Sequence, residues 1–157
     1  MEIRKVNRVY RGRLSSKQKS FKGFHVIPTN PHILKRVFPN RGTVLVFPTT
    51  MRYRAMGKRV SKRWLCSKLK VKSVHFQSVT WVANMGRAIP VDDDSCFTEF
   101  KSLCEPELFP CSRLITINEG TKINMFHSGK CICLGKFFRR KETVASVLLS
   151  LFNHIFV

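Results

Sequence analysis

The order of motifs in this chain of 157 residues repeats after about half its length. The dipeptide NP at 30–31 stands 17 residues before Phe47, and the dipeptide FP at 109–110 stands 17 residues before Phe126, so the period is 79 residues. Each dipeptide is followed by an apolar and basic strand pattern, a turn, a strand that ends in Phe, a further strand and a Gly-Lys step. A duplicated half-domain explains this order. We therefore expect two repeats, 1–72 and 73–157.

Short alternating segments between turns dominate both halves, which predicts strands. We expect strands at 2–14, 32–37, 43–47, 52–56, 73–83, 113–117, 121–126 and 130–135. Helical patterns are fewer. They predict helices at 61–69, where Ser61 is a suitable cap, at 92–103, where acids favour the helix start, and at 143–157, where apolar residues recur at helical spacing. Segregated antiparallel strands and helices predict an α+β fold.

Positive charge is concentrated in the first part of the chain. Residues 1–91 contain 21 Lys and Arg and one acid, Glu2, whereas residues 92–157 contain 8 basic and 8 acidic residues. A field of this kind attracts polyanions and speeds their capture. Nucleic acid is therefore the expected partner. An anionic membrane surface or an acidic protein is a less favoured partner, because the sequence has no long basic amphipathic helix pattern. A membrane-spanning tail is not expected, because the most apolar stretch, 143–157, is shorter than the ~20 residues that a spanning helix needs.

The six cysteines show no C-x-x-C pair. Cys131 and Cys133 are two residues apart, so in a strand they share one face, and this placement suits buried free thiols. Consecutive acids at 92–94 are more typical of a helix cap than of a metal nuclease, since no acidic or His partner stands at useful spacing. We therefore expect no metal, no cofactor and no enzymatic activity.

Two motifs in the second half indicate a family. They are EPELFP at 105–110 and FHSGK at 126–130, separated by a strand hairpin pattern. From residue 78 to about 136 the chain resembles the second repeat of the TATA-box-binding protein (TBP) family, and the rest is similar more loosely. The resemblance implies a saddle: two pseudo-repeats form one curved antiparallel sheet with helices on the convex face. It also implies that the concave face binds the A·T-rich minor groove of double-stranded DNA and bends it by wedging phenylalanines between base pairs.

Alternation independently places several residues of the second half on one face. Asn124 and Phe126 share a face of one strand, and Ile132 and Leu134 share a face of the next. Such an apolar face with little charge suits a minor groove, which rewards shape and apolar contact. The resemblance pairs Phe126 with Phe109 as wedges. It adds the remaining expected DNA contacts of this half, Ser78, Thr80 and Lys130.

The first half is less faithful to the family pattern. The matching DNA contacts here are Asn7, Val9, Leu45, Phe47, Arg54 and Met56. Matching Gly57 to Gly135 sends Tyr53 inward and Arg54 outward, and the burial cost of arginine disfavours the opposite register. Asn30 stands where the second half has the wedge Phe109, so a kink at this end is not implied.

The acids of EPELFP need a separate explanation, because carboxylates beside a phosphate backbone would repel it. In the family this segment meets transcription factor IIB. The resemblance therefore implies that Glu105, Glu107 and Leu108 bind a factor-IIB-like protein. RNA polymerase machinery is a further implied partner, and the implied location is the nucleus or the site of transcription in an infected cell.

Several alternatives stay open at this point. The chain could be a basic nucleic-acid-binding protein that does not bend its ligand, or a TBP-like competitor that regulates transcription. The run KRVSKR at 58–63 suits a phosphate contact, a nuclear import signal or a solvated basic surface.

Overall fold

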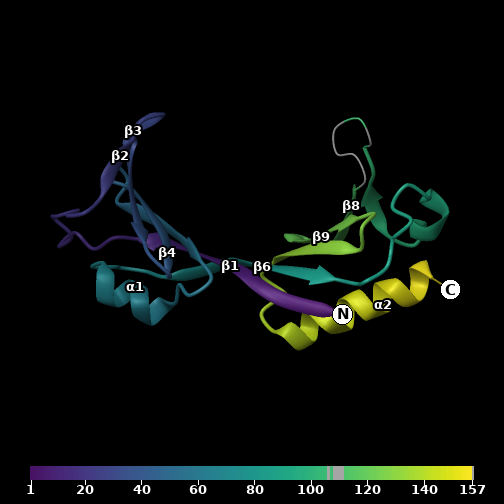
Figure 1. Cartoon of the computed structure of the whole chain (residues 1–157). Helices are drawn as coiled ribbons and strands as arrows, with labels where there is room; N and C mark the ends of the chain where they lie inside the picture. The colour runs from purple at the N-terminus through teal and green to yellow at the C-terminus, as the bar shows by residue number, and fades with distance from the viewer. Residues whose placement is uncertain (106, 108–111, 157) are drawn as a thin grey trace. The chain divides into compact units, whose positions relative to one another are not determined.

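The computed structural model describes residues 1–105, 107 and 112–156 (Figure 1). Its strands form one antiparallel sheet of ten strands in the order β2-β3-β4-β5-β1-β6-β10-β9-β8-β7. The strands are β1 (Glu2–Arg13), β2 (His25–Ile27), β3 (Asn30–Phe38), β4 (Gly42–Phe47), β5 (Arg52–Gly57), β6 (His75–Asn84), β7 (Lys101–Leu103), β8 (Ser112–Asn118), β9 (Thr121–Phe126) and β10 (Lys130–Gly135). The helices are α1 (Lys62–Lys68), α2 (Lys141–Ile155) and the 3-10 turn η1 (Asp94–Phe97). The α+β prediction is confirmed.

Contacts divide the chain into two compact units. We call Asn7–Ser78 the N-unit, and Met1–Val6 together with Val79–Val157 the C-unit. The long strands β1 and β6 each contribute residues to both units. This division follows contacts within the folded chain, whereas the repeats expected at 1–72 and 73–157 follow the sequence order, and their duplication stays a prediction.

The core of the N-unit lies between one face of its sheet and helix α1. Alternation in β4 and β5 turns every second residue inward, and most of these are small or β-branched. The buried cluster consists of Leu14, Val44, Val46, Tyr53, Ala55, Val60, Leu65 and Leu69. Because α1 supplies Leu65 to this cluster, the helix covers this face of the sheet and leaves the other face open.

Helix α1 begins as the sequence predicts. The side chain of Ser61 accepts a hydrogen bond from the backbone N–H of Trp64 at 3.2 Å, which satisfies one of the free donors of the first turn. The helix is only 7 residues long, against 15 for α2. A helix so short gains its stability from packing rather than from its own hydrogen bonds, and Leu65 supplies that packing.

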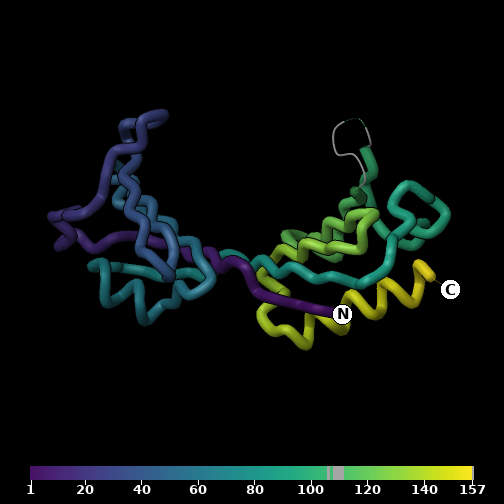
Figure 2. Tube along the Cα trace, viewed as in Figure 1, coloured from purple at the N-terminus to yellow at the C-terminus, as the bar shows by residue number. Residues whose placement is uncertain are grey.

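The C-unit contains β8, β9 and β10 side by side, with α2 along one side of them (Figure 2). The inward residues of these strands include Ile115, Ile123, Met125 and Cys133, all fully buried. The inward face of α2 supplies Val144, Leu148, Leu151, Phe152 and Ile155. The helix predicted from the apolar spacing at the C-terminus is thus confirmed, and its apolar stripe is a packing surface.

The helix predicted at 92–103 is wrong. Only Asp94–Phe97 forms a 3-10 turn, and Lys101–Leu103 forms strand β7, which pairs with β8. The cap itself is present, because Asp93 accepts a hydrogen bond from the Ser95 N–H at 3.1 Å. Edge pairing with β8 outweighs the weak helical preference of these residues. Strand β2 was also missed; its three residues have no pattern of their own.

Cys131 and Cys133 are fully buried in β10, as alternation predicts. Burial raises the pKa of each thiol to about 12, so both stay protonated at neutral pH. Within the described residues no group of three or more His, Cys, Asp and Glu is placed to hold a metal ion. No described helix has the length and apolar content to cross a membrane.

Candidate nucleic-acid interface

Each unit has an open face of its sheet, opposite the face that packs on the helix. In antiparallel strands, residues directly opposite each other share a face, so the ladders define rows that cross the sheet. We call these surfaces the open face of the C-unit and the open face of the N-unit.

The central row on the open face of the C-unit is apolar apart from one amide. Ile132 lies opposite Val82 in β6 and opposite Asn124 in β9. Asn124 in turn lies opposite Leu114 in β8, and Leu114 lies opposite Leu103 in β7. Leu103 is 52% exposed. A row with four apolar residues and one amide on an open sheet face indicates a binding surface.

Polar and basic residues, with Leu134 and Phe126 among them, flank this row. The next row contains Thr80, Leu134, Lys122, Thr116 and Lys101. On the other side Lys130 lies opposite Asn84, and Phe126 lies opposite Ser112. The residues that the sequence assigns to one face, Asn124, Phe126, Ile132 and Leu134, therefore do share it.

The open face of the N-unit has a different composition. Its central row consists of Arg11, Arg54, Leu45 and Lys35. A second row consists of Arg13, Arg52 and Phe47, and a third of Val9, Met56, Thr43 and Val37. Arginine thus occupies positions in β1 and β5 whose counterparts in β6 and β10 of the C-unit include Val82 and Ile132.

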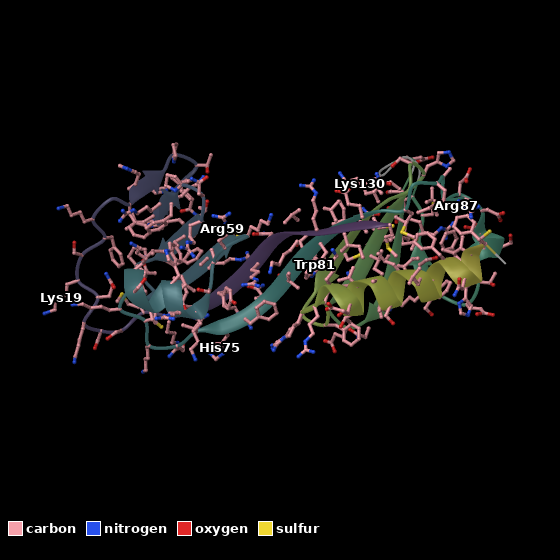
Figure 3. All side chains as sticks on the ribbon, turned by 60° about the horizontal axis from the view of Figure 1, so that its bottom comes forward. Lys19, Arg59, His75, Trp81, Arg87 and Lys130 are labelled. Atoms are coloured by element: carbon pink, nitrogen blue, oxygen red, sulfur yellow. The ribbon has the colours of Figure 1, made fainter. Side chains whose placement is uncertain are left out.

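A pocket of about 600 Å³ lies at the Arg13 end of this face. Its lining includes Arg11 and Arg13 of β1 and Arg52 and Arg54 of β5, together with Phe47, His75 and Gln77. Basic side chains also extend from the rest of this unit, such as Lys19, which reaches outward from the loop after β1 (Figure 3).

Strand β5 has the register that the sequence predicts, with Tyr53 and Ala55 facing the core. Tyr53 is 2% exposed and Ala55 is fully buried, while Arg54 is exposed. Burial raises the pKa of the Tyr53 hydroxyl, which donates a hydrogen bond to the Ser73 carbonyl at 2.8 Å. Val9 lies opposite Met56 on the open face but is only 6% exposed, so it offers little surface to a ligand.

Other predicted positions lie as follows. Asn7 in β1 and Ser78 in β6 are partly exposed and are the first and last residues of the N-unit. The side chain of Asn30 accepts a hydrogen bond from the His32 N–H at 3.1 Å. A phenylalanine further along β3, Phe38, does not replace it as a wedge, because its ring packs edge-on against Trp64 with ring centroids 4.8 Å apart.

The structure describes only part of the acidic segment EPELFP, residues 105–110. Glu105 is partly exposed and Glu107 is exposed, whereas Leu108 and Phe109 lie outside the described residues. The next strand is anchored by Arg113, whose guanidinium is buried and donates to the Val91 carbonyl at 2.6 Å, to Ser102 Oγ at 2.9 Å and to Asp94 Oδ1 at 2.5 Å.

Several face residues were missed from the sequence. Val82, Leu103 and Leu114 complete the central row of the C-unit, and Arg11, Arg13 and Arg52 complete the cationic rows of the N-unit. The two-residue period of β6 could have identified Val82, because it follows Thr80 on the same face. No sequence signal could have placed Leu103, since its strand reads as a helix.

The fold that these strands define is TBP-like, as the sequence predicts. The structure is similar to that of Methanococcus jannaschii TBP, with a TM-score of 0.69 and 17% identity, over 99% of this chain and 98% of that chain. No family model matches the chain, and no curated protein matches it. The chain is therefore a divergent sequence on a TBP-like fold.

Proposed function

We propose that this protein is a transcription initiation factor that binds the minor groove of A·T-rich duplex DNA and bends it. The observation that carries the proposal is the apolar central row on the open face of the C-unit, which a protein of net charge +20 exposes to solvent. A solvated face of a basic protein is ordinarily polar. An apolar face edged by lysines suits the shallow floor of the minor groove, which has few hydrogen-bonding groups and lies between phosphates.

Among the residues that the structure describes, Phe126 is the candidate for a wedge. It ends β9 on the open face, lies opposite Ser112 in β8 and is partly exposed. Phe109 is proposed as its partner by the family resemblance. Unstacking costs a few kcal/mol per base step, and the surface buried by the bent duplex offsets this cost.

A protein partner is proposed for the acidic segment. Glu105 and Glu107 are both accessible in a protein whose acids are scarce, and they suit a basic surface on a factor-IIB-like protein. Leu108 is proposed to add an apolar contact. RNA polymerase machinery is proposed to bind through this partner. The proposed location is the nucleus, or the site of transcription in an infected cell.

Energy transfer between dyes at the two ends of an A·T-rich duplex tests the proposal. The wild-type protein should shorten the end-to-end distance at moderate salt. Phe109→Ala/Phe126→Ala should bind without shortening it. The matched control is Phe137→Ala, because Phe137 is 50% exposed but follows β10 and lies outside the ladder rows.

Two results would contradict the proposal. If the wild-type protein binds the duplex and does not bend it, the protein is a basic nucleic-acid-binding protein of another kind. If Phe137→Ala loses the bend as fully as the double variant, the effect is not specific to the wedge positions. Pull-down with a factor-IIB protein, with and without Glu105→Lys/Glu107→Lys, tests the partner separately; binding that survives the charge reversal would argue against that role.

A further inference from the structure

We propose that the open face of the N-unit binds the phosphates of the duplex through Arg11, Arg13, Arg52 and Arg54, and does not read the groove floor. This inference rests on the proposed function, and it assigns the two halves of the protein different tasks. The C-unit supplies the apolar surface for the groove, and the N-unit supplies a site for the sugar-phosphate backbone.

The four arginines form two cross-strand pairs. Arg11 lies directly opposite Arg54, and Arg13 lies directly opposite Arg52. Opposite residues in antiparallel strands have Cβ atoms about 4.5–5.5 Å apart, and next-but-one residues along a strand are about 6.8 Å apart. Like charges at such distances destabilise the sheet. An anion between the side chains would remove this repulsion.

Nothing within the N-unit neutralises these charges. The segment Asn7–Ser78 contains 18 Lys and Arg residues and no Asp or Glu. Among the residues that the structure describes, none of the four guanidinium groups makes an ion pair or a hydrogen bond. Two other arginines of this unit differ: Arg36 donates to the Lys22 carbonyl and Arg41 to the Arg59 carbonyl. Their role is structural, whereas the four on the open face keep their donors available.

The pocket beside these arginines has a lining that suits a nucleotide unit. It holds about 600 Å³ and adds Phe47, His75 and Gln77 to the guanidinium groups. Guanidinium forks bind phosphate oxygens with two parallel hydrogen bonds, which makes arginine well suited to this contact. The aromatic ring of Phe47 offers an apolar surface for a sugar beside the phosphate.

Comparison of the two open faces explains why phosphate is favoured over the groove floor. Where the C-unit has Val82 opposite Ile132, the N-unit has Arg11 opposite Arg54. Four adjacent charges are costly to bring onto base edges, because each would lose water without an anion to replace it. Phosphates replace that water with an opposite charge.

The slope of binding affinity against salt concentration measures the number of phosphates bound. Each phosphate contact contributes about 0.9 to the slope of log K against log salt for B-form duplexes. Changing all four arginines to glutamine should therefore lower the slope by up to about 3.6. The change should be the same on A·T-rich and G·C-rich duplexes of equal length, because the backbone is common to both.

The matched control removes the same charge from the same unit. Lys58, Arg59, Lys62 and Arg63, each changed to Gln, lie in α1 or the turn before it, on the side of the helix-covered face, and all four are exposed. We expect this variant to lower the slope by less than half as much. An equal reduction would overturn the proposal, because charge alone, without the open face, would then explain binding. A loss confined to the A·T-rich duplex would also overturn it, since that result indicates arginines in the groove.

Bending, measured on the same complexes, separates this inference from the proposed function. The quadruple arginine variant should still bend the A·T-rich duplex at low salt, at protein concentrations that saturate it. If the wild-type protein never bends DNA while the slope changes as expected, the phosphate site stands and the proposed function fails. If bending stands and the slope is unchanged, only the phosphate site fails.

Discussion

Arg11 of β1 lies directly opposite Arg54 of β5, on the face of the sheet that no helix covers. The pair has no acidic neighbour in Asn7–Ser78, since this segment contains no Asp or Glu. Two cations at adjacent ladder positions reduce stability in the absence of a ligand. The paired arginines therefore lower the stability of the free protein at the surface that is proposed to bind phosphate.

Removing one member of this pair should therefore stabilise the free protein. We expect Arg54→Gln to raise the free energy of unfolding by about 0.5 kcal/mol at low ionic strength, because the cross-strand repulsion disappears. Both side chains are exposed, so the gain should shrink as salt screens the charges. Urea unfolding at 20 mM and 500 mM salt checks this. Arg63→Gln, on α1, is the control, and a gain as large there would argue against a specific pair effect.

The buried guanidinium of Arg113 makes a second prediction. The guanidinium donates hydrogen bonds to three acceptors and lies over the ring of Phe97, whose centroid is 4.5 Å from the guanidinium carbon. A side chain without a guanidinium group leaves these contacts unmade. Arg113→Met should lower the free energy of unfolding by about 2–4 kcal/mol, because buried acceptors lose their donors. Asp94→Asn should cost about 1 kcal/mol, since Asp94 is largely exposed and its amide still accepts. Equal losses in the two variants, measured by urea unfolding, would contradict this ranking.

Gly57 and Gly86 allow the cost of steric overlap to be compared with the cost of backbone strain. A Cβ at Gly57 would lie 2.3 Å from the Arg41 carbonyl oxygen and 2.6 Å from Gly42 Cα. Gly57→Ala should therefore destabilise the protein by about 1–3 kcal/mol through overpacking. At Gly86 the space is open but φ is +72°, so Gly86→Ala should cost only about 1 kcal/mol of backbone strain. Thermal melts of both variants decide whether sterics or strain costs more.

The two buried thiols of β10 make a prediction about pH. Their pKa of about 12 in the folded state lies above the ~8.5 of a free thiol. The folded state therefore holds protons that the unfolded state releases, so this stabilising contribution is complete below about pH 8.5 and declines as pH rises toward 12. Cys133→Val should flatten the loss of stability between pH 8.5 and 10. An unchanged slope, measured by urea unfolding at each pH, would contradict the burial effect.

Reactivity of the same thiols can be measured independently. Exposed Cys66 should react with iodoacetamide in the native protein, whereas Cys131 and Cys133 should react only after unfolding. Mass spectrometry of peptides after brief labelling identifies the modified residues. Native labelling of Cys133 would show that β10 opens locally.

Much of the local structure could be predicted because it depends on short-range periodicity. Alternation placed Asn124 with Phe126, and Ile132 with Leu134, on shared faces, since successive side chains of a strand point to opposite sides. The burial cost of a guanidinium placed Tyr53 inside and Arg54 outside. Ser61 as the cap of α1 follows from the same kind of local rule.

Local patterns in the sequence were therefore enough to assign residues to a face within one strand, to locate most elements and to reveal the resemblance to a known family. The order and register of the strands became known from the folded structure. The row that joins Arg11 to Arg54, the strand at Lys101–Leu103 and the buried partners of Arg113 all depend on residues distant in the chain. Local propensities are weak, and pairing with a distant strand overrides them. For this reason the cationic rows of the N-unit appear only when the ladder is known.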